Sequence, residues 1–228
     1  MTIKTCIFDA YGTLFDVTAA ARKAAHEPEH AALKDTWPTL AAHWRDKQLQ
    51  YTWLRAVTGD HTNFWQVTQD GLDWAMEAMN LHDPGLRERL LALYWELDAY
   101  PEVPNMLAAL KADGFNTGIL SNGSPEMLDG AVESAGLEEL LDAVLSVETV
   151  GVFKPDTRVY DLVTARFVSP RDNVLFVSSN GWDAASAMAY GFQTVWVNRA
   201  GLPMDRLPGK PTHVCDDLTA IAELARTL

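Results

Sequence analysis

The most constraining feature of the sequence is an apolar run, residues 4–9, that ends on the carboxylate of Asp9 and continues into a Gly-Thr turn. A carboxylate is costly inside a strand, but open parallel sheets place their ligands at the carboxyl ends of their strands. Gly12 allows a sharp turn, and Thr13 can cap a backbone group or hold an anion there. The stretch therefore predicts a central parallel strand with Asp9 as the candidate reactive group. The alternative is an Asp that begins an ordinary turn.

The composition predicts one large globular domain, or one domain with a sizeable insertion. The 228 residues are 48% hydrophobic, which is enough for a packed core. A net charge of −13 argues against nucleic acid and anionic membranes as partners. An anionic small substrate would need a local basic site, so single Arg and Lys residues in motifs carry more weight than the total charge. The sequence has no apolar run of roughly 18 residues that would predict a membrane span.

The two cysteines, Cys6 and Cys215, each lie inside a short apolar run. We expect both to be buried, reduced thiols and not part of a disulfide framework. A strand pattern begins almost at the first residue, which leaves no room for a signal peptide. Both observations favour a cytoplasmic location.

Residues 17–100 have a helical period almost throughout. Asp83-Pro84 is typical of a helix start, with an N-cap followed by proline in the first turn. The stretch holds six of the eight tryptophans, Trp37, Trp44, Trp53, Trp65, Trp74 and Trp95. Because an aromatic stripe at helical spacing is more often packing than a ligand site, we expect a small helical bundle with its own core.

Beyond residue 100, short apolar runs alternate with helical patterns. Strands are expected at 117–120, 143–146, 174–178, 194–197 and 213–215, with helices between most of them. This βα alternation is typical of a doubly wound parallel sheet. We therefore predict an α/β core of residues 1–16 and 101–228, with a helical cap of residues 17–100 inserted after the first strand.

Polar residues follow four of the predicted strands. The carboxyl ends of neighbouring parallel strands meet in one crevice, so we expect these side chains to converge. Taken singly, a strand-end serine is usually a helix cap and a lysine is usually solvated. Taken together, they predict one site made of Asp9, Thr13, Ser121, Asn122, Lys154, Ser178, Asn180 and Asp183.

The motifs at residues 9–13 (D-x-x-G-T), 121, 154 and 178–183 resemble those of the haloacid dehalogenase superfamily, over essentially the whole chain. The magnesium phosphatases of that superfamily carry an acid two residues after the nucleophile and a carboxylate at the start of the fourth motif. Here those positions hold Tyr11, and Ser178 with Ser179, so much of a Mg²⁺ site would be lost. A halide leaves without a proton, so displacement at carbon needs neither the acid nor the metal.

The chain most closely resembles the (S)-2-haloacid dehalogenase branch, which implies a Rossmannoid fold and neither metal nor cofactor. By this resemblance, Asp9 displaces halide from carbon, and water hydrolyses the resulting ester to a 2-hydroxy acid of inverted configuration. Lys154 would orient Asp9 and favour its charged form. Asp183, steered by Ser178 and Asn180, is the favoured base for the second step, although the sequence leaves open which group takes the proton.

The resemblance also implies a set of substrate-binding residues. Arg45, in the W-R-D-K-Q-L segment of residues 44–49, would hold the halide or the substrate carboxylate; the alternative is a solvated arginine. Asn122 would help to hold the halide, and Ser121 with nearby backbone amides the carboxylate. Tyr160 would support Lys154 or only pack in its helix. The apolar wall around the substituted carbon would consist of Tyr11, Leu49, Phe64 and Trp182.

Two other functions stay open from the sequence. One is a Mg²⁺-dependent phosphatase of the same fold, and the other is a catalytically silent member that binds an anionic metabolite or a partner protein. A screen for halide release separates the three. The expected partner is a small anionic 2-haloacid, and the resemblance adds a homodimer formed through the helical region.

Overall fold

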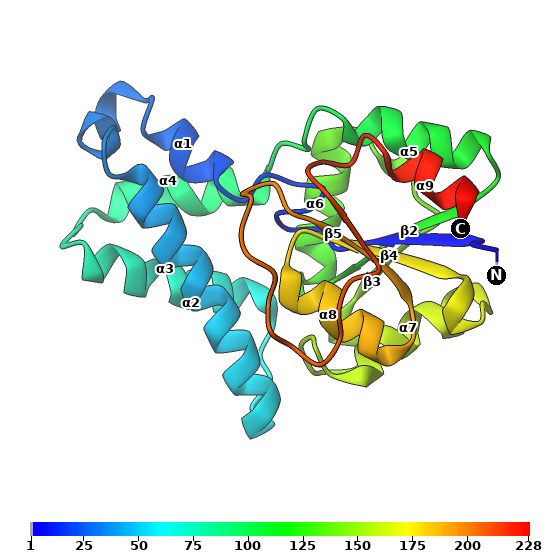
Figure 1. Cartoon of the computed structure of the whole chain (residues 1–228). Coiled ribbons are helices and arrows are strands. Elements are labelled where there is room, and N and C mark those ends of the chain that lie inside the picture. Colours follow the sequence, from blue (N-terminus) through cyan, green and yellow to red (C-terminus); the bar gives the residue numbers. More distant parts are fainter. Residues whose placement is uncertain (1) are drawn as a thin grey trace.

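The computed structural model describes residues 2–228 and contains a six-stranded parallel sheet with helices on both faces (Figure 1). The strand order is β3-β2-β1-β4-β5-β6, so the first strand lies in the middle of the sheet. The strands are β1 (Thr5–Phe8), β2 (Asn116–Ser121), β3 (Ala143–Ser146), β4 (Val174–Ser178), β5 (Gln193–Val197) and β6 (His213–Cys215). The predicted doubly wound α/β fold is confirmed.

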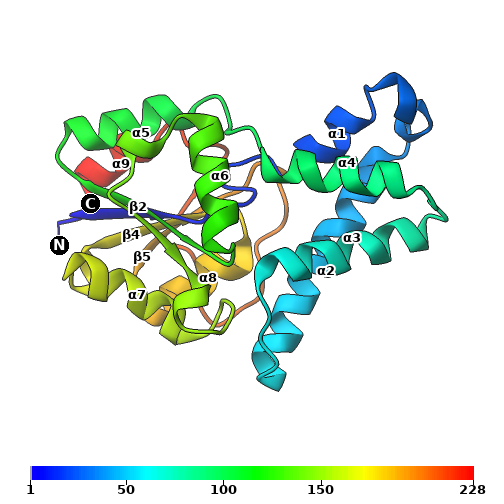
Figure 2. The ribbon, with the colours of Figure 1, turned by 180° about the vertical axis from the view of Figure 1, so that it is seen from behind.

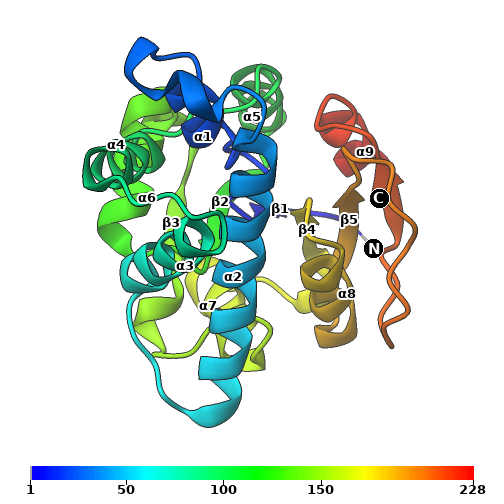
Figure 3. The same cartoon turned by 90° about the vertical axis from the view of Figure 1, so that its left-hand side faces the viewer.

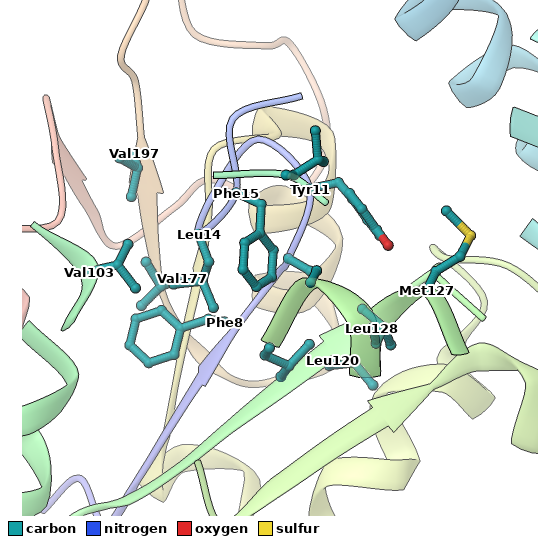
Figure 4. Packing of buried hydrophobic residues seen from close by; sticks show 14 of the residues in the cluster. Phe8, Tyr11, Leu14, Phe15, Val103, Leu120, Met127, Leu128, Val177 and Val197 are labelled. Atoms are coloured by element: carbon teal, nitrogen blue, oxygen red, sulfur yellow. The ribbon is translucent and has the colours of Figure 1, made fainter. Parts of the chain in front are cut away.

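Helices cover both faces of the sheet because each crossover returns the chain to a parallel strand. Figures 1 and 2 show α5, α6 and α9 on one face and α7 and α8 on the other. On the first face, Phe8 and Val177 gather beside Val103 in the apolar layer (Figure 4). These helices are α5 (Val103–Ala112), α6 (Pro125–Ala135), α7 (Thr157–Phe167), α8 (Gly181–Tyr190) and α9 (Ile221–Thr227).

Between β1 and α5 the chain forms a separate group of helices beside the carboxyl ends of the strands (Figures 1 and 3). The side chain of Asp83 accepts a hydrogen bond from Leu86 N at 3.1 Å, as expected for the predicted helix start. The group consists of α1 (Ala19–Ala24), the 3-10 helix η1 (Pro28–Leu33), α2 (Trp37–Thr58), α3 (Phe64–Ala78) and α4 (Pro84–Trp95).

The two chain segments that join this group to the sheet lie side by side. Asp16 N donates to Asp98 O at 2.9 Å, and Tyr100 N donates to Leu14 O at 2.9 Å. This pairing supports a domain division at residues 16–17 and 100–101, which we propose as the cap boundary. Within the cap, Trp44 is buried, but Trp53 and Trp74 are more than a third exposed, so not all of its tryptophans form the expected core.

The cysteines are both free, and only one is fully buried. Burial raises the pKa of the Cys6 thiol to about 12, since Cys6 lies in the central strand. Cys215 is only half-buried, contrary to our prediction, because β6 is one of the two edge strands of the sheet. None of the helices in residues 2–228 has the length and apolar character needed to cross a bilayer.

Candidate active site

The strand ends place two buried carboxylates around one buried ammonium group. Asp9 directly follows β1, Lys154 lies in the loop between β3 and α7, and Asp183 lies in the first turn of α8. Lys154 Nζ is 3.1 Å from Asp9 Oδ1 and 2.8 Å from Asp183 Oδ2. Exposure of the Lys154 side chain is 1%, and that of the two carboxylates 8% and 0%. A buried ion triad of this kind requires every charge to have its partner.

The pKa values of this triad follow from burial and from the neighbouring charges. Burial alone would lower the pKa of Lys154, but Asp183 and Asp9 outweigh that cost and raise it above its usual value. Burial raises the pKa of Asp183, as does the charge of Asp9, while Lys154 opposes both. Asp183 is therefore more basic than an ordinary carboxylate.

Tyr160 holds the other oxygen of Asp183. Its hydroxyl donates to Asp183 Oδ1 at 2.7 Å, and the side chain is fully buried on α7. Burial and the neighbouring Asp183 raise the pKa of Tyr160 well above its usual value, which keeps the hydroxyl a donor. We expected Tyr160 to support Lys154; the structure gives it Asp183 as partner, and it acts on the lysine only through that carboxylate.

Three donors converge on Asp9. Besides Lys154, Thr13 Oγ1 donates to Asp9 Oδ2 at 3.2 Å and Asn180 Nδ2 donates to the same oxygen at 2.7 Å. The turn that carries Thr13 needs glycine, because Gly12 has φ +88° and a Cβ there would lie 3.1 Å from Ser179 Oγ. Ser179 N in turn donates to Thr13 Oγ1 at 2.8 Å, which fixes that hydroxyl. The geometry thus presents an oriented carboxylate.

Ser178 and Asn180 do not steer Asp183 as we predicted. The Asn180 amide contacts Asp9, and Ser178 Oγ accepts from Asn180 N at 3.1 Å. Among the described residues, the Asp183 carboxylate is bonded by Lys154 and Tyr160. The reason is local backbone geometry: Asn180 is extended just before α8, whereas Asp183 already lies in its first helical turn.

The cap supplies a second cation beside the nucleophile candidate. Arg45 on α2 reaches across the boundary, and its Nη2 donates to Tyr11 O at 3.2 Å and to Asn180 Oδ1 at 3.3 Å. Because the amide oxygen of Asn180 faces Arg45, its Nδ2 faces Asp9. The structure therefore brings Arg45 to the predicted site, where its role as an anion clamp stays a proposal.

These side chains enclose a narrow cavity of about 10 Å³ between the carboxyl ends of the strands and the cap. Tyr11 projects from the turn after β1 (Figure 4), and Asn122 Oδ1 accepts from Lys154 N at 2.9 Å. Every residue that lines the cavity is one of those predicted: Asp9, Tyr11, Arg45, Leu49, Phe64, Ser121, Asn122, Lys154, Asn180 and Trp182. Four other predicted residues lie outside the lining, Thr13, Tyr160, Ser178 and Asp183.

We did not predict from the sequence a group of buried cap residues, Gln48, Thr68 and Tyr94, that lies behind Tyr11. Tyr94 of α4 stacks on Tyr11 with ring centroids 5.8 Å apart. Gln48 Nε2 donates to Tyr94 OH at 3.1 Å and to Thr68 Oγ1 at 2.9 Å, although Gln48 is almost completely buried. A signal was present, since Gln48 follows Trp44 by one helical turn and a polar residue on an apolar helix face implies a partner.

Together, the fold and the site define a class of protein: a doubly wound α/β fold with an oriented carboxylate at the carboxyl ends of its strands and a helical cap over that carboxylate. A family model described as haloacid dehalogenase-like hydrolase matches residues 3–191. The chain belongs to this family.

Three relatives show how closely it resembles the dehalogenases. It is 43% identical to (S)-2-haloacid dehalogenase 1 of Pseudomonas sp. strain CBS-3 over 97% of this chain and 96% of that one. The crystal structure of an L-2-haloacid dehalogenase superimposes with a TM-score of 0.93 at 38% identity, covering 99% of both chains. The L-2-haloacid dehalogenase of Xanthobacter autotrophicus, with chloropropionic acid covalently bound, gives a TM-score of 0.89 at 33% identity and covers both chains fully. The resemblance stated from the motifs is confirmed.

Proposed function

We propose that this chain is an (S)-2-haloacid dehalogenase that hydrolyses small (S)-2-haloalkanoic acids to (R)-2-hydroxy acids and halide. The observation that carries the proposal is the Asp9 carboxylate, held by three donors and facing a small cavity with Arg45 on its cap side. The names of the relatives, and the covalent adduct of one of them, point to the same chemistry.

In the first step, a carboxylate oxygen of Asp9 attacks the halogen-bearing carbon in line. The new C–O bond forms as the C–halogen bond breaks, and halide leaves with the bonding electron pair. Covalent catalysis of this kind divides a difficult hydrolysis into two easier steps. Arg45 and Asn122 would hold the halide, Ser121 would hold the substrate carboxylate, and Leu49, Phe64 and Trp182 would exclude water.

In the second step, water attacks the ester carbonyl and one of its protons passes to a base. The acyl C–O bond then breaks, the leaving oxygen takes up a proton to give the 2-hydroxy acid, and Asp9 returns as a carboxylate. We assign the role of base to Asp183, because its raised pKa makes it a better proton acceptor than an ordinary carboxylate. Asp183 does not line the cavity, and Lys154 lies between it and Asp9. The proton path from the cavity to Asp183 would therefore run beside Lys154.

A halide-release assay on chloro-, bromo- and fluoroacids, with both enantiomers of 2-chloropropionate, tests the function. We expect release from the (S) enantiomer and an (R)-hydroxy acid as product. Phosphate release from small phosphomonoesters, with no halide release, would favour the Mg²⁺ phosphatase alternative. Neither activity would favour a silent metabolite- or partner-binding member.

We propose that the reaction needs no metal. Position 11, where the related phosphatases carry an acid, is Tyr, and Ser178 and Ser179 replace the expected carboxylate. The ammonium of Lys154 already lies between the carboxylates of Asp9 and Asp183, where it would supply the positive charge.

Treatment with EDTA is therefore expected to leave the rate of halide release unchanged, and added Mg²⁺ to leave it unchanged as well. The measurement is kcat for (S)-2-chloropropionate before and after dialysis against EDTA. A rate that falls on dialysis and returns with Mg²⁺ would contradict the proposal.

The assembly and the location also stay proposals. Four exposed apolar side chains on α2 and α3, Trp53, Leu54, Val57 and Trp74, support a homodimer through the cap, which sedimentation would test. The two free cysteines support a cytoplasmic location. From the net charge of −13 we expect no nucleic-acid or membrane partner.

Gly123 allows the close packing of Tyr11 against the strand end. A Cβ at position 123 would lie 2.7 Å from Tyr11 Cε2 and 3.1 Å from the Leu128 side chain. We expect Gly123→Ala to displace the Tyr11 ring in the cavity and to lower kcat/KM about 10- to 100-fold. Gly85→Ala, at the exposed start of α4, is the control: its Cβ would lie 3.3 Å from Asp83 Oδ1, outside the cavity lining, so kcat/KM should stay unchanged. Equal activity of the two variants would show that the position of Tyr11 is not critical.

A further inference from the structure

Cap and core also touch outside the catalytic cavity. The loop of residues 59–63 between α2 and α3, cyan in Figure 3, meets the 3-10 helix η3 (Val147–Thr149) that follows β3. There His61 Nε2 lies 3.0 Å from Glu148 Oε2, and we call this contact the clasp. A carboxylate can only accept, so Nε2 carries the shared hydrogen. Away from the two connecting segments, the hydrogen bonds of residues 2–228 cross from cap to core at Arg45 and at His61.

On the cap side, the clasp adjoins the apolar wall of the cavity. The His61 ring packs on Phe153, with ring centroids 4.7 Å apart, and Phe153 directly precedes Lys154. Phe64, at the start of α3, lies 6.3 Å from the same Phe153 ring and lines the cavity. Because Phe64 follows His61 by only three residues, a movement of this loop away from the core would carry the Phe64 ring with it.

On the core side, the clasp is tied to the strand ends. Glu148 N donates to Ser146 Oγ at 3.2 Å, and the Ser146 hydroxyl donates to Gly123 O at 2.6 Å. Gly123 directly follows Asn122, which lines the cavity. The backbone of Glu148 is thus fixed, so a bond from its side chain to His61 sets how close the cap loop lies to the catalytic cavity.

The size of the catalytic cavity implies that its walls separate during turnover. A volume of about 10 Å³ has room for about one water molecule, and a 2-haloacid is several times larger. The acid can enter only if contacts between cap and core break. They must form again around the bound acid, because the reacting groups need fixed positions for in-line attack.

The clasp is suited to breaking and forming again. His61 Nδ1 and Glu148 Oε1 are buried and have no partner among the described residues. In the closed position, their desolvation is therefore offset by a single hydrogen bond. Separation of the loop from η3 would return both side chains to water, so the contact costs little to open.

We propose that His61 and Glu148 are positioning residues that hold the cap closed over a bound 2-haloacid. Neither lines the cavity, so they act through the side chains that do, Phe64 on the cap and Lys154 on the core. This inference rests on the proposed function for its substrate.

Two substitutions of His61 separate the hydrogen bond from the ring contact. His61→Phe keeps a ring against Phe153 but leaves Glu148 without its donor, whereas His61→Gln keeps an N–H donor and removes the ring. We expect KM for (S)-2-chloropropionate to rise about tenfold in His61→Phe, with kcat within about twofold, because a smaller fraction of the enzyme is closed. His61→Gln should stay close to the wild type. The matched control is His82→Phe, an exposed histidine between α3 and α4.

The kinetic result has clear contrary outcomes. An unchanged KM in His61→Phe, or an equal rise in His61→Gln or His82→Phe, would overturn the proposal. A fall in kcat with KM unchanged would do the same, because it would indicate a smaller amount of folded enzyme and not a weaker closure.

Hydrogen exchange tests the clasp without any activity. In the free enzyme, we expect the backbone amides of residues 59–67 to exchange faster in His61→Phe than in the wild type and in His61→Gln. Equal exchange in all three would overturn the proposal. Failure of the wild type to release halide from any 2-haloacid would end the proposed function, whereas the exchange rates would still decide whether the clasp holds the cap.

Discussion

Replacing Asp9 with Asn will reduce halide release about 10⁴-fold or more in kcat, because a neutral amide cannot displace halide to form the ester. The fold should tolerate the change. Lys154 keeps its 2.8 Å ion pair with Asp183, and the amide oxygen of Asn can still accept from Lys154 or Thr13. The measurement is chloride release from (S)-2-chloropropionate under saturating substrate, with circular dichroism as the check on folding.

An ¹⁸O label distinguishes attack by Asp9 from direct attack by water on the substrate carbon. In ¹⁸O water under single-turnover conditions, the wild-type enzyme should carry the label on the Asp9 carboxyl group, because water attacks the ester carbonyl and not the substrate carbon. The control is Asp46→Asn, an exposed carboxylate next to Arg45, which should keep its activity within about twofold. Label that appears in the hydroxy acid first, or an Asp9→Asn variant that still releases halide, would point to direct attack by water.

The convergence of the site could be predicted because it depends on topology. Asp9 and Asn122 lie just beyond strands, and Lys154 lies in the loop that follows β3. A doubly wound sheet brings the carboxyl ends of its strands together whatever the details of packing. The helical period of residues 17–100 similarly predicts a bundle, and its place after β1 predicts that it lies over the same edge.

The pairing of side chains within the site could not be predicted in the same way. Whether Asn180 faces Asp9 or Asp183 depends on where the backbone changes from extended to helical, and the motif alone does not give that position. Tyr160 and Tyr94 reach the site from α7 and α4, and a helical period alone does not say which buried ring contacts which element. The half-buried state of Cys215 depends on the edge position of β6, which is a property of strand order.

Replacing Lys154 with Met will remove activity and also destabilise the fold by about 3–5 kcal/mol, because two nearly buried carboxylates lose the cation between them. Leaving a buried charge unpaired costs more than the pair itself contributes. The measurement is the free energy of unfolding in urea, compared with the wild type at about pH 8. The control is Lys111→Met, which breaks the half-exposed ion pair with Asp142 and should cost less than about 1 kcal/mol.

The pH dependence of that loss identifies the triad as its cause. The folded pKa of Lys154 lies above its usual value of 10.5, so its pairing stabilises the wild type fully below that value and is lost as the pH rises through the folded pKa. Asp183 also has a raised pKa, and without Lys154 the burial and the Asp9 charge that raise this pKa are opposed by the Tyr160 hydrogen bond alone. A carboxyl group with a raised folded pKa contributes stability at low pH that is lost as the pH rises. The free energy of unfolding of Lys154→Met should therefore be closer to that of the wild type at about pH 5 than at about pH 8. The difference between the two free energies should narrow again above about pH 10.5. A deficit that is constant over this whole range would mean that lost packing, and not the unpaired carboxylates, destabilises the variant.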